Sequence, residues 1–218
     1  MKKFILLALL VFTGYKLHQN GYSFTSAKGA FDKDGRPMVV LFNGPGCAEH
    51  CEAIRAVLKS RGANFEEISV AGDDGAPVKN KYGVSQFPTT LIGKREIVGA
   101  DIMQITATLA ETFGKDMLTR MESMAMDNHF DDGGRAKVVM YATSWCGYCK
   151  QQREYFADNG IAYEEIDVEE SSSNQLMYSA LKGTGYPLTY VGYRRFSGYK
   201  EGDIKSAVNE LAKAGPRR

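Results

Sequence analysis

Short apolar runs alternate with amphipathic stretches through residues 137–214. Runs of four to eight residues that alternate or are β-branched have the length of strands, and longer stretches with helical spacing indicate helices. The expected strands are 137–142, 161–168, 188–191 and 194–197. The expected helices are 146–159, 171–182 and a final one with Ile204, Ala207, Val208 and Leu211 on one face. The order β-α-β-α-β-β-α predicts an α/β fold with a mixed sheet flanked by helices.

The pattern occurs twice in the chain. A shift of 99 residues superimposes Cys47 on Cys146, together with the apolar run before each cysteine and the proline 41 residues after it. Between these points the shift is 98 residues, so that Cys51 falls on Cys149. The first copy therefore has the spacing Cys-X-X-X-Cys and the second Cys-X-X-Cys. Self-similarity of this kind marks repeated structural units, so we expect two tandem domains of one fold.

Domain boundaries follow from the repeat. The predicted domains are residues 37–114 and 136–214, joined by a linker helix and loop over 115–135. The linker helix carries three methionines at helical spacing, Met117, Met121 and Met124. Such a stripe usually packs, so we expect an interdomain helix, with a flexible peptide-binding surface as the alternative. A chain of 218 residues with 44% hydrophobic residues can bury two small cores, and its net charge of +1 gives no electrostatic footprint for nucleic acid.

The first 36 residues differ in kind from the repeats. Lys2 and Lys3 precede an apolar run over 4–12, an arrangement typical of an export signal or a membrane anchor. The run is shorter than the ~20 apolar residues that a membrane-spanning helix needs. We therefore predict a signal or anchor segment over 1–17, a tether over 18–36, and a location at the cell envelope on its periplasmic side. The alternative is a buried N-terminal helix in a cytoplasmic protein.

The candidate chemistry lies in the cysteine pairs, each of which stands where a strand is expected to end and a helix to begin. At a helix N-terminus, unpaired backbone N–H groups and the helix dipole stabilise a thiolate. Cys146 is the expected nucleophile toward a substrate disulfide. Cys149, one turn further on, would attack Cys146 and release the reduced substrate. Trp145 and Tyr148 flank the nucleophile and are predicted to form an apolar rim that binds substrate, with a packing role as the alternative for Trp145.

The first pair is open to three interpretations. In Cys47-Ala48-Glu49-His50-Cys51 a spacing of four still places both sulfurs on one helical face, which allows a second working redox pair. The alternatives are a degenerate copy used for packing or substrate binding, and a metal site, since short cysteine pairs also bind metals. We assign no metal ligands from the sequence.

Residues 138–211 resemble a glutaredoxin within the thioredoxin fold superfamily, and residues 39–113 are similar in plan with weaker motifs. The motifs are Tyr141-Ala142-Thr143-Ser144-Trp145-Cys146-Gly147-Tyr148-Cys149, Tyr163-Glu164-Glu165-Ile166-Asp167-Val168 and Gly185-Tyr186-Pro187. The resemblance implies two tandem thioredoxin-like, glutaredoxin-type domains with thiol–disulfide oxidoreductase activity. It also implies that Pro187 is cis and faces the nucleophile, and that the backbone of Tyr186 pairs with an extended substrate. Pro88 is the equivalent residue of the first copy.

The sequence departs from the glutaredoxin pattern in the segments that usually hold glutathione, which here are 142–144, 185–187 and 198–203. Protein disulfides and glutathione mixed disulfides are therefore alternative substrates. We expect no tightly bound cofactor, with glutathione a candidate co-substrate and an electron donor that the sequence does not identify. The alternative function is an iron–sulfur or metal-binding glutaredoxin-like protein, in which Cys146 and Cys47 would hold a cluster between subunits with a thiol cofactor.

Overall fold

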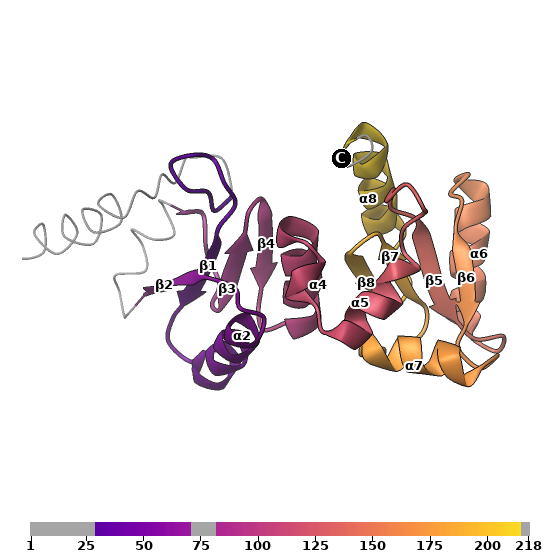
Figure 1. Cartoon of the computed structure of the whole chain (residues 1–218), viewed down its shortest axis with the longest axis horizontal. Coiled ribbons are helices and arrows are strands. Elements are labelled where there is room, and N and C mark those ends of the chain that lie inside the picture. The colour runs from indigo at the N-terminus through magenta and orange to yellow at the C-terminus, as the bar shows by residue number, and fades with distance from the viewer. Residues whose placement is uncertain (1–28, 71–81, 215–218) are drawn as a thin grey trace, which may run out of the picture. The chain divides into compact units, whose positions relative to one another are not determined.

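The computed structural model describes residues 29–70 and 82–214 (Figure 1). The chain separates into two compact units, which meet in the sequence between Ile102 and Met103. Each unit contains one four-stranded mixed sheet, which confirms the predicted pair of α/β domains. Within the described residues, no helix combines the length and the apolar character needed to cross a membrane. The predicted signal or anchor segment lies outside them.

The sheet of the first unit has the order β2-β1-β3-β4. Its strands are β1 (Val39–Asn43), β2 (Phe65–Ser69), β3 (Thr89–Ile92) and β4 (Arg95–Val98). β1 pairs in parallel with β2, whereas the other two pairings are antiparallel. Helix α2 (Ala48–Ser60) connects β1 to β2, and β4 is followed by helix α4 (Ile102–Phe113), which from Met103 onward belongs to the second unit. The second helix predicted for this copy falls in a stretch that includes residues 71–81, outside the described part of the chain.

The second unit repeats this sheet in the order β6-β5-β7-β8, with the same parallel and antiparallel pairings. Its strands are β5 (Val138–Ala142), β6 (Glu164–Asp167), β7 (Leu188–Val191) and β8 (Arg194–Ser197). Its helices are α5 (Arg120–Asp127), α6 (Gly147–Asp158), α7 (Ser172–Ala180) and α8 (Glu201–Ala214), and a 3-10 turn, η2 (Lys115–Met117), precedes α5. From β5 to α8 the order is the predicted β-α-β-α-β-β-α. Only β6 is clearly shorter than the expected strand 161–168.

Helices cover both faces of the second sheet because β5 is apolar on both sides. On one face Val138, Met140 and Ala142 pack against α6 and α8. On the other face Val139 and Tyr141 pack against α5 and α7 (Figure 1). This layering holds α6 against the sheet, and with it the first helical turn that carries the second cysteine pair.

Helix α5 begins after Thr119, whose side chain caps it. Its apolar residues Ala125 and Met126 are buried in the core of the second unit beside α7. Met121 and Met124, which the sequence led us to expect in a packed stripe, are 49% and 56% exposed. That expectation was wrong, because a different face of the helix meets the sheet.

Candidate active site

Cys146 stands at the start of α6, directly after the loop that leaves β5. It is the N-cap residue, and its sulfur accepts a hydrogen bond from the backbone N–H of Cys149 at 3.0 Å. This position usually holds Ser, Thr, Asp or Asn, whose side-chain oxygen accepts the same kind of bond. The sulfur therefore lies where unpaired N–H groups and the positive end of the helix dipole favour a negative charge.

Cys146 and Cys149 form a disulfide with their Cα atoms 5.2 Å apart. The exposed fraction is 7% for Cys146 and 0% for Cys149. Cys146 thus keeps a small exposed fraction, whereas Cys149 is fully buried. The structure thus brings together the two cysteines of the predicted pair, of which Cys146 is the more exposed.

An aromatic surface borders the disulfide. Trp145 and Tyr148 are 67% and 63% exposed, which is unusual for large aromatic side chains. The indole Nε1 of Trp145 donates a hydrogen bond to Glu169 Oε2 at 2.9 Å. The same indole meets the ring of Tyr186 edge-on, with centroids 5.8 Å apart. Trp145 and Tyr186 thus lie in contact, while Tyr148 is exposed on the first turn of α6.

The Tyr186–Pro187 peptide bond is cis, as the resemblance implies. Among the described residues, the backbone N–H and C=O of Tyr186 make no backbone hydrogen bond. Its ring stacks on Tyr178 at 5.0 Å, and the Tyr178 hydroxyl donates to the carbonyl of Gly185 at 2.9 Å. Gly183 permits this packing, since a Cβ there would lie 2.2 Å from the Tyr178 ring. The loop is thus held rigidly while leaving one backbone edge open.

The first cysteine pair is built differently. Cys47 and Cys51 also form a disulfide, with Cα atoms 5.4 Å apart, and Pro88 likewise follows a cis peptide bond. Cys47 is the N-cap of α2, but its side chain accepts no capping hydrogen bond. Cys47 and Cys51 are 5% and 0% exposed. In the described ranges, no group of three or more His, Cys, Asp or Glu side chains is placed to hold a metal ion.

The family model for glutaredoxin matches residues 39–97 and 138–193, together more than half of the chain. This chain belongs to the glutaredoxin family. The two matches fall on the two sheets, so this glutaredoxin has two copies of the fold in tandem.

The known proteins that resemble this glutaredoxin match different shares of its chain. A protein described as a glutaredoxin of Mycobacterium tuberculosis is 35% identical over 48 residues, which are 22% of this chain and 57% of that protein. The protein disulfide-isomerase tigA of Aspergillus niger is 22% identical over 213 residues, 84% of this chain and 56% of that protein. The chain therefore spans a little over half the length of each. The crystal structure of a buckwheat glutaredoxin–glutathione complex matches with a TM-score of 0.35 and 21% identity, over 46% of this chain and 99% of that chain.

Two residues near the active site of this glutaredoxin could not be identified as neighbours of the cysteines from local sequence patterns. Glu169 contacts Trp145 across 24 residues of sequence, a contact for which the sequence contains no local signal. Gln152 is 0% exposed and lies one turn after Cys149. Here a signal existed, because the repeat places Gln152 on Ile54. A polar residue thus occupies a buried helical position that is apolar in the other copy.

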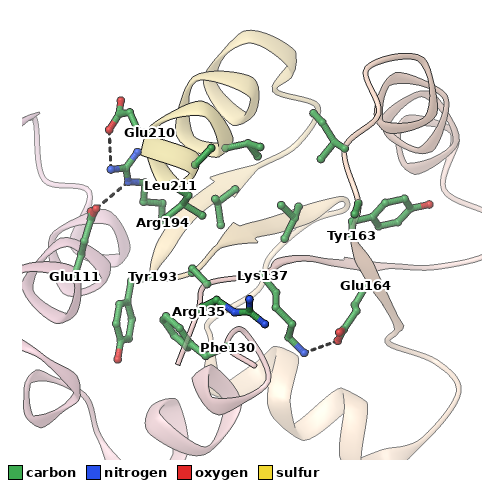
Figure 2. Close-up of a pocket in the computed structure, with 18 of the residues that line it drawn as sticks. Glu111, Phe130, Arg135, Lys137, Tyr163, Glu164, Tyr193, Arg194, Glu210 and Leu211 are labelled. Atoms are coloured by element: carbon green, nitrogen blue, oxygen red, sulfur yellow. Dashed lines mark hydrogen bonds and ion pairs between the residues drawn. The ribbon is translucent and has the colours of Figure 1, made fainter. Parts of the chain in front are cut away.

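A pocket of about 1020 Å³ lies at the other end of the second sheet (Figure 2). It is lined by the residues that lead into β5 and β6, by the turn between β7 and β8, and by the last part of α8. Several of its charged side chains are paired. Lys137 bonds to Glu164 at 2.7 Å, and Arg194 bonds to Glu111 and Glu210 at 2.8 Å each. None of the predicted site residues lines this pocket, so it is separate from the cysteine site.

Proposed function

We propose that this chain is a thiol–disulfide oxidoreductase that reduces or isomerises disulfides, with Cys146 as nucleophile and Cys149 as resolving cysteine. The observation that carries the proposal is the hydrogen bond from the backbone N–H of Cys149 to the Cys146 sulfur at the start of α6. The same N–H would stabilise a Cys146 thiolate. Membership of the glutaredoxin family and the greater exposure of Cys146 support the assignment.

The reaction begins with the protein reduced. The Cys146 thiolate attacks one sulfur of a substrate disulfide, a bond forms between these two sulfurs, and the substrate S–S bond breaks. The other substrate sulfur leaves as a thiolate and takes up a proton. The product of this step is a mixed disulfide between Cys146 and the substrate.

Cys149 completes the exchange. It loses its proton and attacks the Cys146 sulfur, so that the mixed disulfide breaks and the second substrate sulfur leaves as a thiolate. The protein ends with the Cys146–Cys149 disulfide present in the structure, and two electrons have passed to the substrate. An external thiol donor must then reduce the protein again. This mechanism needs no bound cofactor.

The surroundings of Cys146 favour an extended protein segment as substrate. Trp145 and Tyr148 present exposed aromatic surface beside the disulfide. Tyr186 offers an open backbone edge to which an extended peptide can add as a strand. A protein disulfide is therefore the main substrate in this proposal. Glutathione mixed disulfides are the alternative substrate, with glutathione as co-substrate.

Trapping of the mixed disulfide tests the proposal. In Cys149→Ser the resolving sulfur is missing, so reaction with a disulfide should stop at an adduct on Cys146. The reduced variant is mixed with insulin, as a protein disulfide probe, and separately with oxidised glutathione. Peptide mass spectrometry should find an adduct on Cys146 that dithiothreitol removes, more rapidly formed with insulin. The absence of an adduct with both probes would refute the assignment, and Cys146→Ser is the control.

A further inference from the structure

Among the described residues of the second unit, three buried polar side-chain atoms have no hydrogen-bond partner: Thr143 Oγ1, Gln152 Nε2 and Thr189 Oγ1. Their residues are 1%, 0% and 0% exposed. Buried polar groups in native proteins are almost always paired, and an unpaired one costs free energy. Gln152 has the largest unmet capacity of the three, because its amide nitrogen can donate two hydrogen bonds.

Gln152 lies on α6 one turn after Cys149, on the buried face that also carries Phe156. Its Oε1 accepts a hydrogen bond from the backbone N–H of Lys200 at 3.4 Å, which anchors the oxygen end of the amide. Side chains on a helix lean toward its N-terminus, over the preceding turn. Gln152 therefore lies on the same face of α6 as Cys149, with its unpaired Nε2 one turn from that cysteine.

Thr189 lies in β7 of the sheet that α6 packs against. It lies directly opposite Met140 in the pairing of β5 with β7, and Met140 packs in the same core cluster as Cys149. Residues directly opposite each other in antiparallel strands point to the same face. The Thr189 side chain thus points to the face of the sheet that α6 and α8 cover, on which Cys149, at 0% exposed, also packs.

The first copy lacks the amide. The repeat places Ile54 where the second copy has Gln152, and Thr90 where it has Thr189. Both Ile54 and Thr90 are buried. An apolar residue is therefore compatible with this position of the fold, and the amide is a specific feature of the second site.

We propose that Gln152 donates a hydrogen bond from Nε2 to the sulfur of Cys149 once the disulfide opens, and thereby promotes the attack of Cys149. The proposal rests on the role of Cys149 as resolving cysteine. A disulfide sulfur is a weak hydrogen-bond acceptor, whereas a thiolate is a strong one. The Nε2 of Gln152 has no partner in the disulfide form, and it gains the Cys149 thiolate as a partner in the mixed-disulfide form. In that step the proton of Cys149 passes to the leaving substrate thiolate, a bond forms between Cys149 and Cys146, and the bond from Cys146 to the substrate breaks.

Other titratable groups around Cys149 do not supply this stabilisation. Those in the same core cluster are Tyr155, Tyr163, Tyr186 and Cys146. Burial raises the pKa of the first two, which keeps them neutral. Lys150 and Lys200 are exposed, and Arg153 is bonded to Glu165 on β6. The Gln152 amide, by contrast, is fully buried and its Nε2 has no hydrogen-bond partner.

The test measures the pH at which Cys149 reacts, in the Cys146→Ser background. Gln152→Met preserves the volume of the side chain and removes the donor, Gln152→Glu replaces the donor by an acid, and Gln151→Met alters an exposed neighbour as a control. The pH at which alkylation of Cys149 by iodoacetamide is half-maximal should rise by about 1 pH unit in Gln152→Met and by more in Gln152→Glu. Gln151→Met should leave it in place. An unchanged or lower pH in Gln152→Met overturns the proposal.

A second measurement follows the chemical step. With Cys149 intact, release of a preformed mixed disulfide on Cys146 should be about tenfold slower in Gln152→Met at neutral pH, and the deficit should shrink as the pH rises. A structural role alone would change thermal stability without this pH dependence. The alkylation assay needs no turnover. If Cys149→Ser traps no substrate, the proposed function fails; if trapping succeeds but Gln152→Met shifts neither pH nor rate, only the role of Gln152 fails.

Discussion

The two cysteine pairs differ at the residue scale by one hydrogen bond. The Cys146 sulfur accepts a hydrogen bond from the backbone N–H of Cys149, whereas the Cys47 side chain accepts no capping hydrogen bond. We expect reduced Cys146 to ionise at lower pH than reduced Cys47, because the N–H stabilises the thiolate. With Cys149→Ser and Cys51→Ser, half-maximal alkylation should occur about 1 pH unit lower for Cys146. The same pH for both cysteines, or the reverse order, would contradict this explanation.

The hydrogen bond between Trp145 and Glu169 predicts a measurable role in substrate binding. Glu169→Leu removes the acceptor, whereas Glu169→Gln retains one. Trp145 is the only tryptophan of the chain, so its fluorescence reports on this contact directly. We expect Glu169→Leu to alter the emission and to raise KM for a protein disulfide about two- to tenfold with kcat unchanged, because the indole loses its orientation. Glu169→Gln should behave as the wild type; equal effects of both variants would argue against the hydrogen bond.

The positions of the cysteines and the prolines at the ends of elements could be predicted from the sequence, whereas the contacts of the groups around them could not. Cys146, Cys149 and Pro187 are recognisable because each stands at a strand end or a helix start, which local patterns reveal. Glu169 meets Trp145 only because the loop after β6 lies beside the loop after β5. Such a contact depends on tertiary structure, and no spacing along the chain encodes it.

At the scale of elements, a buried histidine ties the loop before β5 to α5 and to the sheet. His129 Nε2 lies 3.0 Å from the Tyr141 hydroxyl, and Nδ1 lies 3.1 Å from the Met126 sulfur. Burial lowers the pKa of His129 to about 3 and raises the pKa of Tyr141. Both groups are therefore neutral near pH 7. The neutral ring and the hydroxyl thus link Met126 of α5, the loop and β5 through these two contacts.

The neutral His129 predicts a loss of stability in acid. The unfolded chain takes up a proton below the ordinary histidine pKa of about 6.5, whereas the folded chain does so only near pH 3. The contribution is therefore complete above about pH 6.5 and is lost as the pH falls toward 3. Between about pH 6.5 and 4.5, the free energy of unfolding of the wild type should fall by about 2 kcal/mol more than that of His129→Gln, measured with urea. Parallel pH profiles would contradict the buried neutral ring.

Element boundaries in the second copy follow from the sequence to within a few residues, but the loops that precede the sheets do not. Asp32 bonds to the backbone N–H and the guanidinium of Arg36, and Asp131 bonds in the same way to Arg135. These loops lie in the segments predicted as tether and linker, since side-chain hydrogen bonds leave no apolar periodicity. The repeat contained the signal, because Asp32 and Asp131 superimpose at the same shift of 99 residues.

At the scale of the whole molecule, the two copies share the same sheet order and the same type of ion pair, but they differ at the cysteine site. In each, an arginine on the first helix pairs with a glutamate on the second strand: Arg55 with Glu67 at 2.6 Å, and Arg153 with Glu165 at 2.7 Å. The sheet order is also the same. The two copies differ in the spacing of their cysteines and in the hydrogen bond to the first sulfur. We infer that the second copy carries the exchange reaction and that the first is not required for it.

The most direct test compares turnover of insulin disulfides by Cys146→Ser with turnover by the double variant Cys47→Ser/Cys51→Ser, with dithiothreitol as reductant. The account predicts that Cys146→Ser falls to the rate of the reductant alone, because the attacking sulfur is gone, whereas the double variant retains most of the wild-type rate. Undiminished turnover by Cys146→Ser would contradict the account.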